Sequence, residues 1–240
     1  MKKIYQNEWF DIKFSDLGIE LSKKEVASVE FYSAFYRKFY QIYSSYSDLP
    51  KNWLSIKNEV AIHINNNLGD KRNILSIGCG NGYIENKLIE NNKSLNIIAI
   101  EPSIDSSHLL SNSNIKILNG YFPAILKGRY KASDFDYIYA SSIDYVFDDT
   151  SYKEFLKSIF EFGIQDFLLT EVFLSEKGLI NKIKDTLREI KIKLEINNEI
   201  QFWGYLRTIE EHISFLQIAG YTKFECGQYD HGAYWIRARI

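Results

Sequence analysis

Three closely spaced glycines, Gly78, Gly80 and Gly82, are the residues of this sequence that most clearly indicate a binding site. They follow a short apolar run at residues 73–77 and precede a stretch with helical spacing. Glycines at such a place let the backbone turn tightly and approach a ligand, while the N-terminus of the following helix offers free N–H groups. The fingerprint of dinucleotide-binding proteins is Gly-x-Gly-x-x-Gly or Ala, but Tyr83 stands at its third small position. The loop therefore predicts a close-fitting ligand and disfavours a nicotinamide dinucleotide.

An acidic residue, Glu101, ends the next apolar run, nineteen residues after Gly82. In a parallel sheet this position lies beside the glycine loop, at the carboxyl edge of the strands. A carboxylate there can accept hydrogen bonds from both hydroxyls of a ribose. The structural alternative is a set of ordinary turn glycines and a solvated strand end, which leaves the combination unexplained. We therefore expect the loop and Glu101 to bind one ligand that carries a ribose.

Composition and charge restrict the partners of the protein. Its 240 residues carry 29 Lys and Arg against 31 Asp and Glu, a formal net charge of −2. This balance argues against a large phosphate-binding surface and against nucleic acid as a partner. The 2 cysteines are far apart, so they form no disulfide framework and no Cys-rich metal site. The first residues lack a signal-peptide core, and no window approaches the ~18 apolar residues of a membrane span. We expect a cytoplasmic protein that binds no membrane.

Apolar runs alternate with helical stretches from residue 69 onward, and this alternation predicts the fold. The first expected strands are residues 73–77, 95–100, 115–118, 135–140 and 167–170. Near-continuous apolar strands indicate a parallel sheet that helices cover on both faces. Two further runs, at residues 221–226 and 234–240, are spaced as a hairpin, so the last strand should run antiparallel to the rest. Residues 69–240 are thus predicted to form a doubly wound, mostly parallel, seven-stranded α/β core.

Helices should connect these strands at residues 82–91 and 152–162, and Ser103 should cap a further helix after the second strand. Thr208 followed three residues later by Glu211 has the pattern of a capping box and predicts the start of the last helix. Residues from about 175 to 205 break the alternation, and their highly charged, helical spacing predicts a helical insertion.

Residues 1–68 have helical spacing and no convincing strand, so we expect a helical cap or lid. Phe and Tyr residues recur at helical intervals between residues 31 and 43, which places their side chains on one helix face. A second helix is expected at residues 54–66. The aromatic stripe fits core packing, and it also fits a lid that lines a pocket; both roles are compatible. In the lid, Tyr32 and Tyr36 would reach toward the ligand.

The stretches at residues 75–82 and 98–103 resemble motifs of the class I S-adenosylmethionine-dependent methyltransferases. The resemblance extends from about residue 73 to residue 240. It implies a seven-stranded sheet, S-adenosylmethionine as cofactor and S-adenosylhomocysteine as product. It places the methionine half on the glycine loop, the ribose at Glu101, the adenine after the third strand and the methyl transfer after the fourth. The residues that it assigns to the cofactor are Gly78, Cys79, Gly80, Gly82, Glu101, Pro102, Asn119, Gly120, Ala140 and Ser141.

Catalytic candidates lie in segments expected at the carboxyl edge of the sheet. His231, in the turn of the final hairpin, is the candidate base because histidine titrates near neutral pH, and an exposed turn histidine is an equal alternative. Asp144 and Tyr145 follow the fourth strand as further candidates, or as a loop acid and a packing aromatic. Asp144 and Glu171 end neighbouring strands, as in catechol-type metal-dependent methyltransferases. We predict no metal, because the carboxylates are too few.

Candidates for binding the acceptor are Tyr32 and Tyr36 of the cap and two residues that precede the last helix, Trp203 and Arg207. Arg207 could clamp a carboxylate or phosphate of the acceptor. Equally, it could pair with the acidic residues at positions 210 and 211.

A small-molecule acceptor fits these features best, because an aromatic helical cap suits a small, enclosed ligand. The family's motif for methylating DNA amino groups, Asn/Asp-Pro-Pro-aromatic, is absent after the fourth strand, where residues 141–145 read Ser-Ser-Ile-Asp-Tyr. We predict methyl transfer by in-line displacement, with oxygen slightly favoured over nitrogen. The alternatives are an aminopropyl transferase, a dinucleotide oxidoreductase or a non-catalytic cofactor-binding protein. The acceptor and the oligomeric state stay open.

Overall fold

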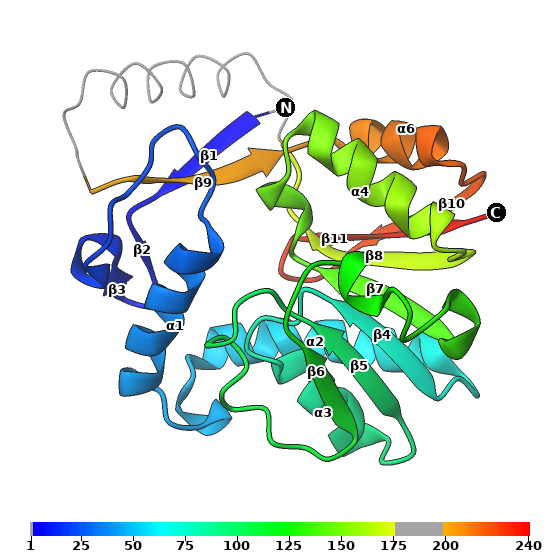
Figure 1. Ribbon diagram of the computed structural model, residues 1–240, viewed down its shortest axis with the longest axis horizontal. Helices are drawn as coiled ribbons and strands as arrows, with labels where there is room; N and C mark the ends of the chain where they lie inside the picture. The colour runs from blue at the N-terminus through cyan, green and yellow to red at the C-terminus, as the bar shows by residue number, and fades with distance from the viewer. Residues whose placement is uncertain (1, 176–198) are drawn as a thin grey trace.

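The protein is described by a computed structural model that covers residues 2–175 and 199–240 (Figure 1). Its centre is a seven-stranded sheet with the order β10-β11-β8-β7-β4-β5-β6. These strands are β4 (Asn73–Ile77), β5 (Asn96–Ile100), β6 (Ile115–Leu118), β7 (Tyr137–Ser141), β8 (Asp166–Val172), β10 (Lys223–Gln228) and β11 (Tyr234–Arg239). The strands from β4 to β8 run parallel, and β11 lies antiparallel between β8 and β10. The predicted fold class, a doubly wound, mostly parallel sheet with an antiparallel last strand, is confirmed.

Helices cover both faces of this sheet (Figure 1). The pair α2 (Lys51–Leu68) and α3 (Tyr83–Asn91) packs on one face, and the pair α4 (Asp149–Glu161) and α6 (Ile209–Ala219) packs on the other. Because both faces are covered, the strand residues are apolar in unbroken runs rather than in alternation. Within the two described ranges, no helix is both long enough and apolar enough to cross a bilayer.

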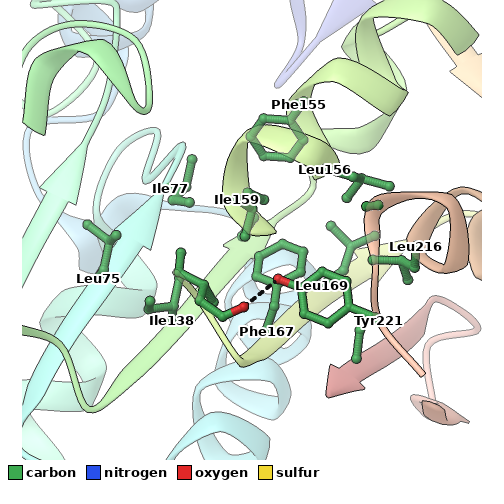
Figure 2. Close-up of a cluster of buried hydrophobic side chains, with 14 of the residues drawn as sticks. Leu75, Ile77, Ile138, Phe155, Leu156, Ile159, Phe167, Leu169, Leu216 and Tyr221 are labelled. Carbon is green, nitrogen blue, oxygen red and sulfur yellow. Dashed lines mark hydrogen bonds between the residues drawn. The ribbon is translucent and has the colours of Figure 1, made fainter. Parts of the chain in front are cut away.

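The core between the sheet, α4 and α6 consists of large apolar side chains that solvent does not reach (Figure 2). Leu156 of α4, Leu216 of α6 and Phe167 of β8 are fully buried there. Burying a side chain of this size contributes about 1.5–3 kcal/mol. Tyr221 is buried beside them, and its hydroxyl donates a hydrogen bond of 2.9 Å to the carbonyl of Ile164. The buried hydroxyl of Tyr221 therefore has a hydrogen-bond acceptor within the core.

Side chains cap the N-termini of the first and the last described α-helix. At the start of α1 (Val29–Ile42), the Ser28 hydroxyl accepts the backbone N–H of Phe31 at 3.2 Å. At the start of α6, the Thr208 hydroxyl accepts the N–H of Glu211 at 3.3 Å. The Glu211 carboxylate accepts the N–H of Thr208 at 2.8 Å. The capping box predicted from the sequence is therefore confirmed.

The segment between β5 and β6 contains turns and no α-helix, so the prediction of a helix starting at Ser103 is wrong. The hydroxyl of Ser103 instead forms a hydrogen bond of 3.0 Å with the hydroxyl of Ser33 on α1. Residues 103–114 are rich in Ser and Asn, whose side chains compete with a helix for backbone groups. Asn112, for example, accepts the N–H of Asn114 at 3.0 Å through its side chain.

Three short strands precede α1, which corrects the prediction of a helical segment without strands at residues 1–68. They are β1 (Lys2–Gln6), β2 (Glu8–Trp9) and β3 (Ile12–Lys13). β1 pairs antiparallel with β9 (Gln201–Leu206), a partner about 200 residues away. Residues 201–205 are therefore strand and not part of a helical insertion. The rest of the predicted insertion, residues 176–198, lies outside the described residues.

The N-terminal strands, α1 and β9 form a separate layer beside the sheet, with an aromatic core of its own (Figure 1). Trp9 stacks on Phe35 with ring centroids 4.7 Å apart, and Trp203 of β9 stacks on Phe14 at 5.5 Å. The aromatic stripe of α1 therefore packs a core, as one of its two interpretations predicted. α2 differs, because its buried side chains, such as Ile64, pack with the sheet.

Candidate active site

A cavity of about 680 Å³ lies between the carboxyl ends of the parallel strands and the N-terminal layer. One side is built by residues that follow β4, β5, β6 and β7, namely 78–81, 101–103, 120–122, 141–143 and 145–147. The opposite side comes from α1 and from residues 9–10 and 26–29, and Trp53 and Lys57 of α2 contribute from the flank. Cavities of a few hundred Å³ with apolar walls are typical of sites for small ligands and cofactors.

The glycine loop takes backbone conformations that favour glycine. Gly78, Gly80 and Gly82 have φ values of 78°, 55° and 73°, in the left-handed region. A Cβ atom on Gly78 would clash with the side chain of Ile143, and one on Gly80 would lie 3.2 Å from the hydroxyl of Tyr36. Gly78 and Gly80 line the cavity, whereas Gly82 is the N-cap residue of α3 and does not. The loop therefore keeps the cavity open at the first two glycines.

Glu101 lies where the sequence places it, on the cavity wall beside this loop. Its Oε2 accepts the backbone N–H of Gly80 at 2.9 Å, and its Oε1 accepts the N–H of Ser103 at 3.0 Å. Burial raises the pKa of Glu101 above its ordinary value, and these two backbone donors partly oppose that shift. The carboxylate is thus fixed in orientation, and each oxygen keeps a lone pair for a further donor.

The other residues assigned to the cofactor divide into two groups. Cys79, Pro102, Gly120 and Ser141 line the cavity. Ala140 and Asn119 do not. Ala140 is buried in the strand β7, and the side-chain amide of Asn119 donates to the carbonyl of Glu101 at 3.3 Å.

The thiol of Cys79 is desolvated, and burial raises its pKa well above the ordinary value. It is therefore protonated at neutral pH and not a nucleophile.

Two tyrosine hydroxyls meet in the wall of the cavity. The hydroxyls of Tyr32 and Tyr145 form a hydrogen bond of 3.1 Å, and both residues line the cavity together with Tyr36. Burial raises the pKa of Tyr145 to about 12 and raises that of Tyr32 well above 10. Both groups are therefore protonated near neutral pH. Trp203 does not line the cavity; it stacks behind Tyr145 at 6.0 Å and holds that ring in place.

Glu85 of α3 is a cavity residue that the sequence analysis missed. It is 1% exposed, and its Oε1 accepts the hydroxyls of Ser76 at 2.5 Å and Tyr139 at 2.6 Å. Burial raises the pKa of this carboxyl. A signal was present, since Glu85 shares the buried face of α3 with Ile84 and Leu88. An acid among apolar helix positions indicates a buried role.

Lys57, Glu171 and Ser141 form a second cluster that the sequence analysis missed. The carboxylate of Glu171 accepts a hydrogen bond of 2.5 Å from Lys57 Nζ and one of 2.6 Å from the Ser141 hydroxyl. Lys57 and Ser141 line the cavity, with Glu171 behind them. Glu171 and Ser142 have φ values of 55° and 56°, which cost roughly 1–2 kcal/mol each for residues other than glycine. Strain of this kind concentrates at functional sites.

The structure does not bring His231 to the cavity. Its Nδ1 lies 2.7 Å from Glu59 Oε2 on α2, and its ring stacks on Tyr229 at 5.2 Å. It is not among the residues that line the cavity. The hairpin turn holds His231 against a helix, so the geometry lends no support to a base at this position.

Arg207 is fully buried and binds protein groups instead of an acceptor. Its Nε donates to Asp149 at 3.0 Å, its Nη1 to the carbonyl of Asp144 at 3.0 Å and its Nη2 to the carbonyl of Phe147 at 2.6 Å. It therefore holds the loop after β7, the segment that carries Tyr145 into the cavity. Neither Arg207 nor Asp144 lines the cavity.

Asp144 faces a buried histidine rather than the cavity. Its Oδ2 lies 3.7 Å from Nε2 of His212, whose Nδ1 is 2.9 Å from the Tyr152 hydroxyl. Burial raises the pKa of Asp144 to about 7 and lowers that of His212 to about 3. Asp144 and Glu171 thus have separate partners. Among the described residues, no group of three or more His, Cys, Asp or Glu side chains could hold a metal ion.

No protein-family model and no curated protein sequence matches this chain. Solved structures do match it. Human N-acetylserotonin methyltransferase in complex with S-adenosylmethionine superimposes with a TM-score of 0.58 and 16% identity, over 88% of this chain and 56% of that chain. Mitomycin 7-O-methyltransferase MmcR superimposes with a TM-score of 0.57 and 15% identity, over 77% of this chain and 54% of that chain. PigF with S-adenosylhomocysteine superimposes with a TM-score of 0.59 and 13% identity, over 89% of this chain and 60% of that chain.

The chain has the fold of the class I S-adenosylmethionine-dependent methyltransferases. The resemblance seen in the glycine loop is thereby confirmed at the level of the fold. The chain spans less than two thirds of the length of these three structures. In this methyltransferase fold, the cavity and Glu101 occupy the carboxyl edge of the sheet, where ligands of open α/β sheets bind.

Proposed function

We propose that this protein transfers the methyl group of S-adenosylmethionine to a small-molecule acceptor. The observation that carries the proposal is the position and fixed orientation of the Glu101 carboxylate. Its carboxylate is fixed by the N–H of Gly80 on the wall of a cavity, next to a glycine loop, in a methyltransferase fold. The free lone pairs of such a carboxylate match the two hydroxyls of a ribose.

The residues present fit this cofactor. Gly78 and Gly80 line the cavity with left-handed backbone angles, which lets the main chain itself form the wall against which the cofactor would lie. Glu101 would hold the ribose, and the aromatic rings of Tyr121 and Phe122 would flank the adenine. Tyr36 lines the cavity with its hydroxyl beside Gly80, where it would meet the part of the cofactor that rests on the loop. Bound S-adenosylmethionine would supply an electrophilic methyl group at its sulfonium.

The protein's own residues would align the acceptor and exclude water, which is the main requirement of an in-line displacement. Aromatic side chains, among them Trp9, Phe10 and Phe39, build the acceptor side of the cavity and favour a flat, largely apolar acceptor. The Tyr32 and Tyr145 hydroxyls are its central polar groups. Their raised pKa values make them hydrogen-bond donors that orient the acceptor, and not general bases.

Oxygen remains the favoured acceptor atom. The paired tyrosines suit an acceptor that both accepts and donates a hydrogen bond, as a hydroxyl group does and a neutral amine also does. MmcR, one of the structures with the same fold, is named a 7-O-methyltransferase. This name supports oxygen as the acceptor atom in the proposal.

We also propose that the N-terminal layer acts as the cap of this site. It is fastened to the cofactor side by hydrogen bonds from Tyr46 to the carbonyl of Asn81, at 2.8 Å, and from Ser33 to Ser103, at 3.0 Å. Arg37 and Asp105 add an ion pair of 3.0 Å at the surface. The cap therefore closes over the cavity where the cofactor would lie.

Calorimetric titration tests the cofactor, with S-adenosylhomocysteine, NAD⁺ and decarboxylated S-adenosylmethionine as ligands. We expect one molecule of S-adenosylhomocysteine to bind per chain and NAD⁺ not to bind. Binding of NAD⁺ alone would make the protein an oxidoreductase, and preference for the decarboxylated compound would make it an aminopropyl transferase.

Transfer is tested with methyl-labelled S-adenosylmethionine and a panel of phenols and aromatic amines. Label in a methyl ether supports the proposal, and label in amines only would shift the acceptor atom to nitrogen. Tight cofactor binding without transfer to any member of a broad panel would favour the non-catalytic alternative.

A further inference from the structure

Glu85 is a buried carboxylate with only half of its hydrogen-bonding capacity in use. One oxygen, Oε1, accepts the hydroxyls of Ser76 and Tyr139. The other, Oε2, is buried and has no hydrogen-bond partner among the described residues. Leaving a buried charged group unpaired costs at least about 1–3 kcal/mol. A cost of this kind at the wall of a cavity indicates that a ligand supplies the missing donor.

The position of Glu85 says which part of a ligand it would meet. It lies in the first turn of α3, directly after the glycine loop, and its charge acts on the thiol of Cys79 within that loop. Glu101 lies at the end of the neighbouring strand β5 and would hold the ribose. The oxygen of Glu85 is thus placed for the portion of the ligand that rests on the loop.

The cation whose charge acts on the pKa of Glu85 already forms an ion pair with another carboxylate. Lys57 of α2 lowers the pKa of Glu85 through its charge, but its ammonium group is bonded to Glu171 at 2.5 Å. The two hydroxyl groups on Oε1 are neutral donors. The site therefore still calls for a positively charged donor at Oε2.

We propose that Oε2 of Glu85 binds the α-ammonium group of the methionine half of the cofactor, and that this contact makes the protein select ligands that carry this ammonium group. The inference rests on the proposed function. An ammonium group offers three donors and a positive charge, so it satisfies the unpaired oxygen and offsets the desolvated charge. Glu85 thereby becomes a specificity-determining residue separate from the ribose site.

Acid should weaken this contact. Burial raises the pKa of Glu85, Lys57 from α2 opposes the shift, and the hydroxyls of Ser76 and Tyr139 oppose it from β4 and β7. Glu101 also faces this region, and its own pKa is raised in part by Glu85. As the pH falls, Glu85 takes up a proton in the free protein and loses its attraction for an ammonium group. Affinity for S-adenosylhomocysteine should then fall relative to a ligand without the amino acid.

The test compares three ligands by calorimetry on wild-type protein and on Glu85→Gln. S-adenosylhomocysteine carries the whole amino acid, S-adenosyl-3-thiopropylamine carries the ammonium group only, and 5′-methylthioadenosine carries neither. We expect Glu85→Gln to weaken the first two by roughly 10- to 150-fold, the effect of one hydrogen bond to a charged group, and the third by less than twofold. The matched control, Glu101→Gln, should weaken all three.

Each other outcome overturns a distinct claim. An equal loss for all three ligands would make Glu85 a structural residue. A loss for S-adenosylhomocysteine without a loss for the thiopropylamine would remove the ammonium assignment. Failure of wild-type protein to bind any of the three would refute the proposed function instead. If Glu85→Gln does not fold, the wild-type ratio of affinities for S-adenosylhomocysteine and 5′-methylthioadenosine decides: it must fall on acidification, and a ratio that is constant over the whole pH range in which the protein is folded overturns the inference.

Discussion

Replacement of Glu101 by glutamine perturbs the carboxylate on which the cofactor proposal depends. The two carboxylate oxygens accept the N–H groups of Gly80 at 2.9 Å and Ser103 at 3.0 Å. A glutamine side chain has one acceptor oxygen, so its NH₂ group would face one of these donors. An unpaired donor costs about 1–3 kcal/mol. Because burial already disfavours the charged form of Glu101, the loss of the charge offsets part of this cost, and we expect the free energy of unfolding to fall by about 1 kcal/mol.

The effect of Glu101→Gln on the ligand should be larger. A ribose hydroxyl that donates to a carboxylate contributes about 1.5–3 kcal/mol, which corresponds to a roughly 10- to 150-fold loss of affinity. The loss should be the same for S-adenosylhomocysteine and 5′-methylthioadenosine, since both carry the ribose. Calorimetric titration measures the affinities, and urea unfolding measures the stability. Lower stability with wild-type affinity would show that the carboxylate only fastens the loop, and the ribose assignment would be refuted.

Three further changes test other parts of the structure. Gly80→Val should abolish binding of S-adenosylhomocysteine in calorimetry, because φ is 55° and a Cβ atom would lie 3.2 Å from the Tyr36 hydroxyl; wild-type affinity would place the ligand elsewhere. Arg207→Met should lower the free energy of unfolding in urea by about 1–3 kcal/mol, since it leaves the carbonyls of Asp144 and Phe147 without their donor; an unchanged stability would contradict this. Asp144 has a pKa raised to about 7 in the folded protein against 3.8 for an ordinary Asp, so this carboxyl contributes a fall in stability as the pH rises between these values, while His212, with its pKa lowered to about 3, contributes an opposing rise. In Asp144→Asn this fall should be smaller, and equal slopes for both proteins in urea titrations from pH 4 to pH 8 would refute the assignment.

Local sequence patterns were sufficient to predict the sheet and one half of the site. The strands from β4 to β8 are apolar runs because both faces are covered, and that pattern is visible without knowledge of their partners. Gly78, Gly80 and Glu101 were predictable for a similar reason. Their chemistry follows from backbone geometry at the ends of two adjacent strands.

The side of the cavity that we propose for the acceptor depends on contacts between distant segments, which single positions do not reveal. His231 is held by Glu59, and Arg207 is held by carbonyls that follow β7, so residue type alone suggested roles that the packing does not support. Glu171 was considered only as a metal ligand, while its partners Lys57 and Ser141 lie 114 and 30 residues away in the sequence. Such pairs form only after the chain has folded.

The pairing of β1 with β9 fixes the order in which the molecule can be completed. In a fully unfolded chain, bringing these strands together would close a loop of about 200 residues, at a chain-entropy cost on the order of 5 kcal/mol, and a sheet that is already folded shortens the loop and lowers this cost. During synthesis, the strands β4 to β8 emerge before β9, so the sheet and the glycine loop can assemble while β1 still lacks its partner. The nascent protein therefore has a binding edge that is open to solvent before it has an enclosed site. A ligand seated on the open edge would favour the pairing of β1 with β9, because it would bind the enclosed cavity more tightly than the open one.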